Sequence, residues 1–156
     1  MALLLQYTLI YASVLMLVAL GGCFSERSGV INLGLEGTMV MGALGGALVM
    51  KYMGDLPAAL MIAAVILGSV IFGMLYTLLL AVSAINFKAD QTLVGTAMNL
   101  LGTAAATVIV KAINMAENVN NVSSSIQYIE QRKAFAAFKI GNFEVSWFMI
   151  LAVLLL

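Results

Sequence analysis

The sequence has no histidine, one cysteine, one proline and few charged residues. Without histidine, a zinc or haem site built on imidazole ligands is excluded, and the single Cys23 excludes a disulfide scaffold. Charged residues make up 9% of the chain, whereas an average soluble domain has about 25%. This shortage of charge excludes a disordered chain. The charges of the seven basic and seven acidic residues cancel, and a net charge of zero argues against binding to nucleic acid.

Apolar residues dominate instead, at 63% of 156 residues with a mean hydropathy of +1.11. A soluble domain of this size could not hide so much apolar surface, so the composition indicates an integral membrane protein in contact with lipid. Three uncharged stretches reach the length of about 20 residues that crosses a bilayer, namely 1–25, 56–87 and 91–110. Because these runs are continuously apolar rather than alternating, they predict helices and not a barrel.

Another span is predicted around the uncharged stretch 37–50, extended back to about residue 32 and forward through a snorkelling Lys51. This extension places Glu36 inside the membrane or at its edge. The last uncharged stretch, 145–156, is too short to cross, so it predicts a truncated fifth helix and a piece of a longer protein. The expected fold is an all-α polytopic helical bundle of four full transmembrane helices plus the truncated fifth, in a single transmembrane domain over 1–156.

Small residues recur at helical spacing inside three of these stretches. Such residues let helix backbones approach closely in lipid, although glycine is common in membrane helices in any case. The pattern predicts a packed bundle rather than a single anchor. The residues are Gly42 and Gly46, Ser69 and Gly73, and Gly95, Gly102 and Ala106.

The most unusual segment is 21–38, between the first two apolar stretches. It carries adjacent opposite charges at Glu26 and Arg27, and its glycines predict a glycine-rich break before the second helix. Broken helices of this kind line substrate pathways in transporters, and an ionisable residue in a membrane is a candidate functional site. The glycines are Gly29, Gly34 and Gly37.

Asn32 and Glu36 lie four residues apart in this segment, so on a helix they share a face. Two interpretations of Glu36 stay open. It lines a substrate pathway, or it is a structural cap that accepts hydrogen bonds or pairs with Arg27.

Residues 24–37, which read FSERSGVINLGLEG, resemble the hallmark of one family of ABC-transporter permeases. That family serves nucleosides and simple sugars, within the class of the ribose and branched-chain amino acid permeases. Residues 88–101, KADQTLVGTAMNLL, resemble the segment that leads into a later helix of the same family. The resemblance covers the whole chain but only the N-terminal half of such a permease. It assigns motif or structural roles to Glu26, Arg27, Gly29, Gly34, Gly37 and Asp90.

The resemblance implies a transport subunit that is not an enzyme and moves its substrate by alternating access. It implies a second permease subunit in a homo- or heterodimer, separate ATPase subunits that bind ATP, and an extracellular substrate-binding protein. The chain itself has no GxxxxGK[ST] run and needs no cofactor or metal of its own. The segment that couples to the ATPase lies beyond residue 156 in the family. The implied location is the bacterial inner membrane, with several spans.

Residues 111–146 form a long polar loop, within which 127–138 is predicted to be a short helix. The loop holds several basic residues, so the positive-inside rule would place it in the cytoplasm. The resemblance implies the opposite, with an external N-terminus, cytoplasmic loops near Arg27 and Lys88, and an external polar loop. We follow the resemblance on this point.

The candidate residues of a substrate pathway are polar or aromatic groups in or beside apolar stretches: Asn32, Glu36, Asn99, Tyr11 and Gln91. Asn99 sits in an apolar helix and must find a partner, so helix–helix adhesion is its alternative role. An intramembrane enzyme is disfavoured, because Cys23 has no imidazole to activate it. A membrane assembly subunit without a pathway, or an inactive permease fragment, is the alternative function. It would be favoured if Asn32, Glu36 and Asn99 were buried against each other.

Overall fold

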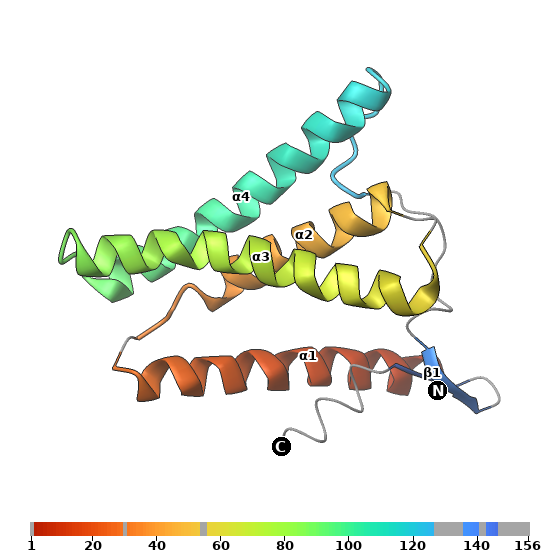
Figure 1. The fold of residues 1–156 in the computed structure, drawn as a ribbon, viewed down its shortest axis with the longest axis horizontal. Coiled ribbons are helices and arrows are strands. Elements are labelled where there is room, and N and C mark those ends of the chain that lie inside the picture. Colours follow the sequence, from red (N-terminus) through yellow and green to blue (C-terminus); the bar gives the residue numbers. More distant parts are fainter. Residues whose placement is uncertain (1, 30, 54–55, 127–135, 141–142, 147–156) are drawn as a thin grey trace. The chain divides into compact units, whose positions relative to one another are not determined.

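The computed structural model describes residues 2–29, 31–53, 56–126, 136–140 and 143–146. Their regular elements are helices and a pair of short strands (Figure 1): α1 Ala2–Arg27, α2 Leu35–Tyr52, α3 Ala58–Ile85, α4 Gln91–Glu117, β1 Ala136–Ile140 and β2 Phe143–Ser146. The chain divides into two compact units, one of Met1–Gly29 with Glu130–Leu156 and one of Val30–Ile129.

Three of the described helices are long and apolar enough to cross a membrane, and they occupy Tyr7–Arg27, Ala59–Ile85 and Gln91–Glu117. These are the helices predicted from the uncharged stretches 1–25, 56–87 and 91–110. The second expected span is a helix too, but α2 is not among these three. Its 18 residues include Glu36, Lys51 and several glycines, which lower its mean hydropathy.

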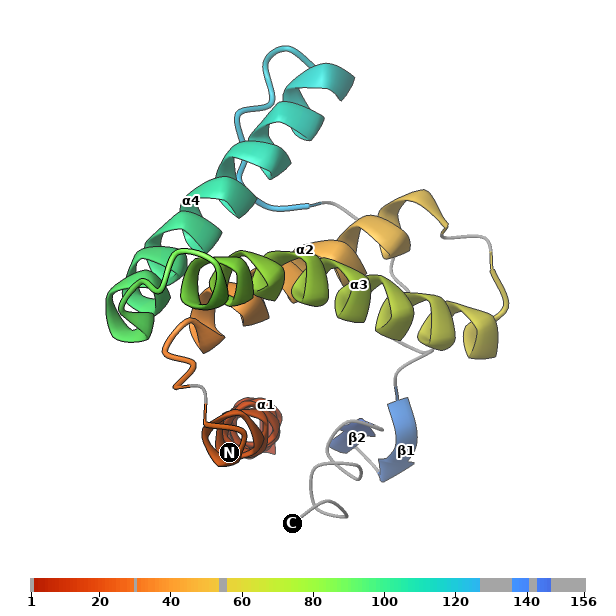
Figure 2. The same cartoon turned by 60° about the vertical axis from the view of Figure 1, so that its left-hand side comes forward.

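The two strands lie in the predicted polar loop and pair antiparallel, with Lys139 opposite Glu144 (Figure 2). Residues 136–138 were expected at the end of a short helix, and this part of the prediction is wrong because they belong to β1. Gly-Asn separates the two strands in the sequence, a dipeptide that favours a hairpin over a continued helix. The remainder of that expected helix, 127–135, lies outside the described residues. Of the expected fifth helix, residues 145–146 belong to β2 and 147–156 lie outside the described part.

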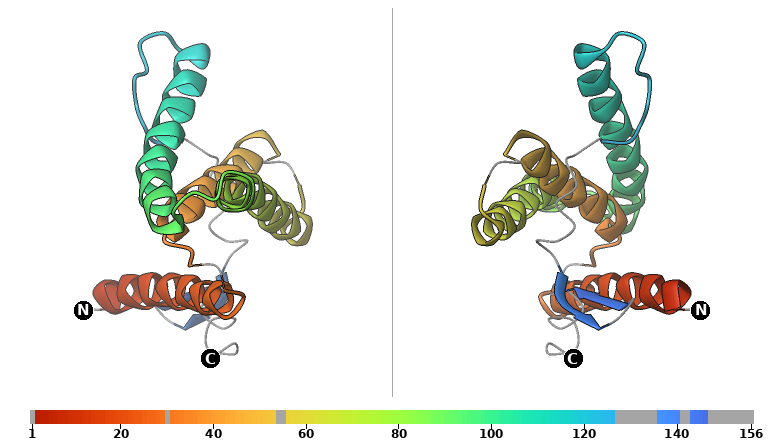
Figure 3. Two further views of the ribbon diagram at one scale, coloured as in Figure 1. Left: turned by 90° about the vertical axis from the view of Figure 1, so that its left-hand side faces the viewer. Right: turned by 90° about the vertical axis from the view of Figure 1, so that its right-hand side faces the viewer.

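Within the unit Val30–Ile129, α2 packs most extensively on α3 and then on α4, while α3 and α4 contact each other less (Figures 1 and 3). Glycines make the α2–α3 contact close. A Cβ added at Gly45 would lie 2.7 Å from the Gly68 carbonyl oxygen, and one at Gly46 would lie 2.5 Å from the Ser69 hydroxyl. The predicted role of small residues in helix packing is confirmed here.

The opposite side of α3 carries a row of exposed apolar side chains. Among them are Leu67, Ile71 and Met74, which are 61%, 52% and 66% exposed. Such a face in a helix of membrane-spanning length suits contact with lipid or with further helices. The inward side of α3 differs, because its Tyr76 and Leu80 are buried in a cluster with Met98 of α4.

Candidate functional site

The non-helical residues before α2 lie against the first turns of α4. The Ile31 backbone N–H donates to the Gln91 side-chain oxygen at 3.0 Å. The Asn99 side-chain N–H donates to the Leu33 carbonyl oxygen at 2.9 Å. These bonds bring residues 31–33 of the first segment that carries the resemblance against residues 91–99 of the second. Segments that are more than 60 residues apart therefore form one structural junction.

Asn99 also completes the start of α2. The N-cap residue is Gly34, which has no side chain to accept a hydrogen bond. The Oδ1 atom of Asn99 accepts from the Gly37 backbone N–H at 2.8 Å instead. Gly37 is the third residue of the first turn, whose N–H is the usual target of an N-cap side chain. Asn99 thus caps α2 from a different helix.

The segment before α2 is further ordered by Asn32. Its Oδ1 accepts from the Gly34 N–H, two residues ahead, at 3.0 Å. This is the local turn that asparagine side chains favour. Three side-chain amides, from Asn32, Gln91 and Asn99, therefore satisfy the backbone of a segment that has no helix or sheet of its own.

Glycines allow the backbones of α2 and α4 to touch at the junction. A Cβ on Gly37 would lie 2.6 Å from the Met98 carbonyl oxygen, and one on Gly102 would lie 2.8 Å from the Gly37 Cα. A Cβ on Gly95 would lie 2.9 Å from the Leu33 Cβ. Glycine occupies these positions because a side chain has no room there. Asn99 can reach the α2 backbone only because the two helices lie this close.

The start of α4 and its position against α3 are fixed by two more hydrogen bonds. Asp90 is the N-cap of α4, and its carboxylate accepts from the Thr92 N–H at 2.8 Å. The buried Tyr76 hydroxyl of α3 donates to the Met98 carbonyl oxygen, one residue before Asn99. The motif residue Asp90 therefore has a local structural role, and α3 is tied to the same turn of α4.

Glu36 lies in the first turn of α2, on a different side from Gly37. Its side chain is exposed and makes no hydrogen bond or ion pair within the described part of residues 31–126. The structure brings Asn32, Gln91 and Asn99 into one junction. Glu36 is the second residue of α2, next to Gly37, whose N–H donates to Asn99. A carboxylate in the first turn also suits the positive end of the helix dipole.

The remaining predicted residues belong to the other compact unit. Tyr11 lies on α1 and is 69% exposed, while Glu26 and Arg27 are exposed in the last turn of α1. Gly29 follows with a φ of +84°, a left-handed conformation that glycine adopts without strain.

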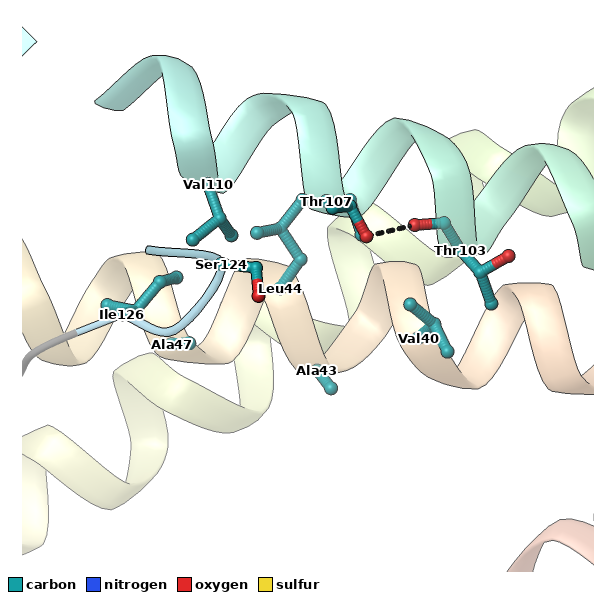
Figure 4. Close-up of a pocket in the computed structure, with 10 residues that line it drawn as sticks. Val40, Ala43, Leu44, Ala47, Thr103, Thr107, Val110, Ser124 and Ile126 are labelled. Carbon is teal, nitrogen blue, oxygen red and sulfur yellow. Dashed lines mark hydrogen bonds between the residues drawn. The ribbon is translucent and has the colours of Figure 1, made fainter. Parts of the chain in front are cut away.

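A groove of about 420 Å³ lies between α2 and α4, starting one helical turn beyond the junction (Figure 4). Sequence reasoning missed its polar residues, which are Thr103 and Thr107 on α4 and Ser124 after it. The signal was the spacing of polar residues along α4, which places both threonines on the helix face that carries Asn99. The groove is lined by Val40, Ala43, Leu44, Ala47, Thr103, Ala106, Thr107, Val110, Ser124 and Ile126.

One end of this groove is covered by the residues that follow α4. The buried Asn114 amide donates to the Ser123 carbonyl oxygen at 2.9 Å and to the Ser125 carbonyl oxygen at 3.0 Å. These bonds hold the segment 118–126 back over the helix, so that Ser124 and Ile126 line the groove (Figure 4). Neither Asn114 nor this segment was expected from the sequence.

The C-terminal ends of α2 and α4 are joined by an ion pair. Lys51 Nζ lies 2.8 Å from Glu117 Oε1, with the lysine side chain 10% exposed and the glutamate 55% exposed. Because the start of α2 also lies against the start of α4, these two helices run parallel.

Helices of membrane-spanning length, packed by glycines around a non-helical junction, define a polytopic helical membrane protein. The chain belongs to the family described as branched-chain amino acid transport system/permease component, which matches residues 4–156. The predicted resemblance to this class of permeases is confirmed. No solved structure matches the chain.

Three curated relatives illustrate the similarity. The guanosine ABC transporter permease protein NupQ of Bacillus subtilis is 46% identical over 106 residues, covering 68% of this chain and 33% of NupQ. The nucleoside ABC transporter permease protein NupC of Lactococcus lactis subsp. cremoris is 31% identical over 120 residues, covering 77% and 38%. A putative glucose ABC transporter permease protein, TsgC13 of Haloferax volcanii, is 38% identical over 104 residues, covering 67% and 30%. The chain spans about a third of the length of these relatives.

Proposed function

We propose that this chain is the N-terminal part of the permease subunit of an ABC importer for nucleosides. The names of the two relatives that are permeases for guanosine and for nucleosides support this substrate class over a sugar. The subunit moves its substrate by alternating access and does no covalent chemistry. ATP is bound by separate ATPase subunits.

The observation that carries the proposal is the junction between the start of α2 and α4. Asn99 lies eight residues beyond the start of α4, which is about 12 Å along the helix axis at 1.5 Å per residue. The non-helical residues 31–34 therefore run beside the first turns of a helix of membrane-spanning length. Irregular backbone at this depth is tolerated only where protein or water satisfies it, as the three amides do here. Transporters place such breaks beside their substrate pathways.

In this proposal α2 also crosses the membrane, which brings the number of spanning helices among α1 to α4 to four. Glu36 is the ionisable group that faces the pathway just beyond the non-helical residues 31–34. Asn32, Gln91 and Asn99 border the same pathway and hold the backbone that presents Glu36. Tyr11 on α1, in the other compact unit, stays a candidate pathway residue because of its aromatic ring. Glu36 is exposed while the three amides are bonded to backbone, so the carboxylate is the group most available to a solute.

The proposed assembly has a second permease subunit, as a homo- or heterodimer, two ATPase subunits and an extracellular substrate-binding protein. It lies in the bacterial inner membrane with the N-terminus outside. The parallel α2 and α4 then both begin at the cytoplasmic side. The pair of Lys51 with Glu117 and the segment 118–126 lie at the external side.

Uptake of radiolabelled guanosine tests the proposal, in cells that carry the complete permease gene with its transporter partners and lack other nucleoside importers. We expect Glu36→Gln to lower uptake at least tenfold at equal membrane abundance. The matched control Glu117→Gln removes a charge at the far end of the bundle, keeps an acceptor for Lys51 and leaves uptake unchanged. If the complete transporter imports no nucleoside, the assignment is wrong. Unchanged uptake by Glu36→Gln would remove Glu36 from the pathway.

A further inference from the structure

Polar side chains form a stripe along α4 that continues from the junction into the groove. The stripe runs from the helix start past Asn99 to the middle of the span, at intervals of three or four residues, so its members share one face. The threonines are exposed within the uncharged stretch 91–110 of α4. The members are Thr92, Thr96, Asn99, Thr103 and Thr107.

The hydroxyl protons of this stripe are already used within α4. Thr103 Oγ1 lies 3.2 Å from the Asn99 carbonyl oxygen and 3.0 Å from that of Leu100. Thr107 Oγ1 donates to the Thr103 carbonyl oxygen at 2.7 Å. A hydroxyl has one proton and two lone pairs, so each threonine presents only acceptor capacity to the groove. Glu36 lies one turn before Val40 in α2 and adds acceptor oxygens at the junction end of the groove.

The groove has the size and lining of a small-molecule site. Its volume of about 420 Å³ falls in the usual range for ligand pockets, and its walls are mainly apolar with a few polar groups. Figure 4 shows Val40 and Thr103 toward one end and Ser124 with Ile126 toward the other. The apolar side chains suit the face of a ring, while the threonine oxygens suit groups that donate hydrogen bonds.

We propose that the α2–α4 groove is a water-filled part of the substrate pathway that binds a neutral solute through the solute's hydrogen-bond donors. This inference rests on the proposed function and specifies its ligand chemistry. Ribose hydroxyls and a base amino group are donors that match the threonine acceptors on the α4 wall. A phosphorylated nucleotide carries negative charge toward Glu36 and is rejected. The other possible occupants, a further helix or lipid chains, would leave the groove without water.

Cysteine accessibility tests whether the groove holds water. The chain has one cysteine, so Cys23→Ser in the complete permease with its partners gives a background without thiols in this region. Ala43→Cys and Thr107→Cys place a thiol on each wall, and Ile71→Cys on the exposed apolar face of α3 is the matched control. The probe is a charged, water-soluble methanethiosulfonate reagent.

We expect both groove positions to be labelled at least tenfold faster than position 71, and guanosine to slow this labelling. Labelling at the control rate would overturn the inference, because it means that a helix or lipid fills the groove. Labelling that guanosine does not slow would overturn the ligand assignment. These outcomes are read from the labelling rate, so they do not depend on transport activity.

Hydroxyl removal tests the recognition of donors. Thr103→Val and Thr107→Val keep the side-chain shape, and the loss of one hydrogen bond predicts about a three- to tenfold rise in KM for guanosine. Thr8→Val on α1 removes a hydroxyl bonded in the same way to a carbonyl four residues back, and it leaves KM unchanged. Thr107→Ser restores the acceptor and the wild-type KM.

The two proposals fail in different ways. If the wild-type transporter imports guanosine while both valine variants match Thr8→Val, the groove does not recognise the solute and only this inference falls. If the wild type imports no nucleoside, both fall.

Discussion

Replacing Asn99 by leucine tests whether this residue holds α2 in place. The change removes two hydrogen bonds, to the Leu33 carbonyl oxygen and from the Gly37 N–H, and keeps a side chain of similar size. Each backbone group left without a partner costs about 1–3 kcal/mol, so the pair predicts a loss of about 2–6 kcal/mol. Loss of an ordinary N-cap costs about 0.5–2 kcal/mol, so the expected effect exceeds a simple capping defect.

Thermal unfolding of the purified complete permease in detergent measures this loss. At about 2–4 °C per kcal/mol, Asn99→Leu should lower Tm by at least about 4 °C. Asn99→Asp keeps the acceptor for the Gly37 N–H and loses the donor to Leu33, so its Tm should fall by a smaller amount. Thr96→Val, one turn away on the exposed side of α4, should leave Tm within about 1 °C of wild type because surface substitutions change stability little.

Two results would refute the reasoning. An Asn99→Leu protein as stable as Thr96→Val would show that the junction does not depend on the amide. An Asn99→Asp protein as stable as wild type would show that the bond from Asn99 to the Leu33 carbonyl oxygen adds nothing.

Two further substitutions test the packing and the capping around the junction. Gly37→Ala should sharply reduce the amount of folded permease in membranes, because its Cβ would lie 2.6 Å from a backbone oxygen. The control Gly21→Ala, with open space around it, should leave this amount unchanged. Equal amounts of the two variants would contradict the close contact at Gly37. Asp90→Ala should cost about 0.5–2 kcal/mol in thermal unfolding by removing the N-cap of α4, whereas Asp90→Asn should retain most of the stability. If alanine and asparagine behave alike, the cap is not what Asp90 provides.

The helices could be predicted from the sequence because charge marks where apolar spans begin and end. The stretch 91–110 predicted α4, which begins at Gln91 after the capping Asp90 and continues to Glu117. The helix goes beyond the uncharged stretch because Lys111 does not stop it, and Glu117 near its end pairs with Lys51.

The start of α2 could not be placed in the same way. Extension of the span back to about residue 32 followed from membrane length alone, whereas α2 begins at Leu35. The residues before it are held out of the helix by Gln91 and Asn99, which are distant in sequence. Local patterns predicted that Asn99 needs a partner, but they could not say which one.

The groove and the hairpin were missed for different reasons. A helical threonine usually satisfies its hydroxyl within its own helix. Unlike Asn99, Thr103 and Thr107 therefore did not require a partner outside α4. The strand pair sets Lys139 opposite Glu144, and a helix over the same region would not place these two residues together.

The cap that Asn99 supplies sets an order of events during synthesis of the chain. Asn99 is added 62 residues after Gly37, so α2 leaves the ribosome before the group that finishes its first turn exists. α2 is also not among the three helices that are long and apolar enough to span a membrane, and its glycines gain their contacts only when α3 and α4 are made. α2 therefore gains its cap and its closest backbone contacts only after α4 has been made.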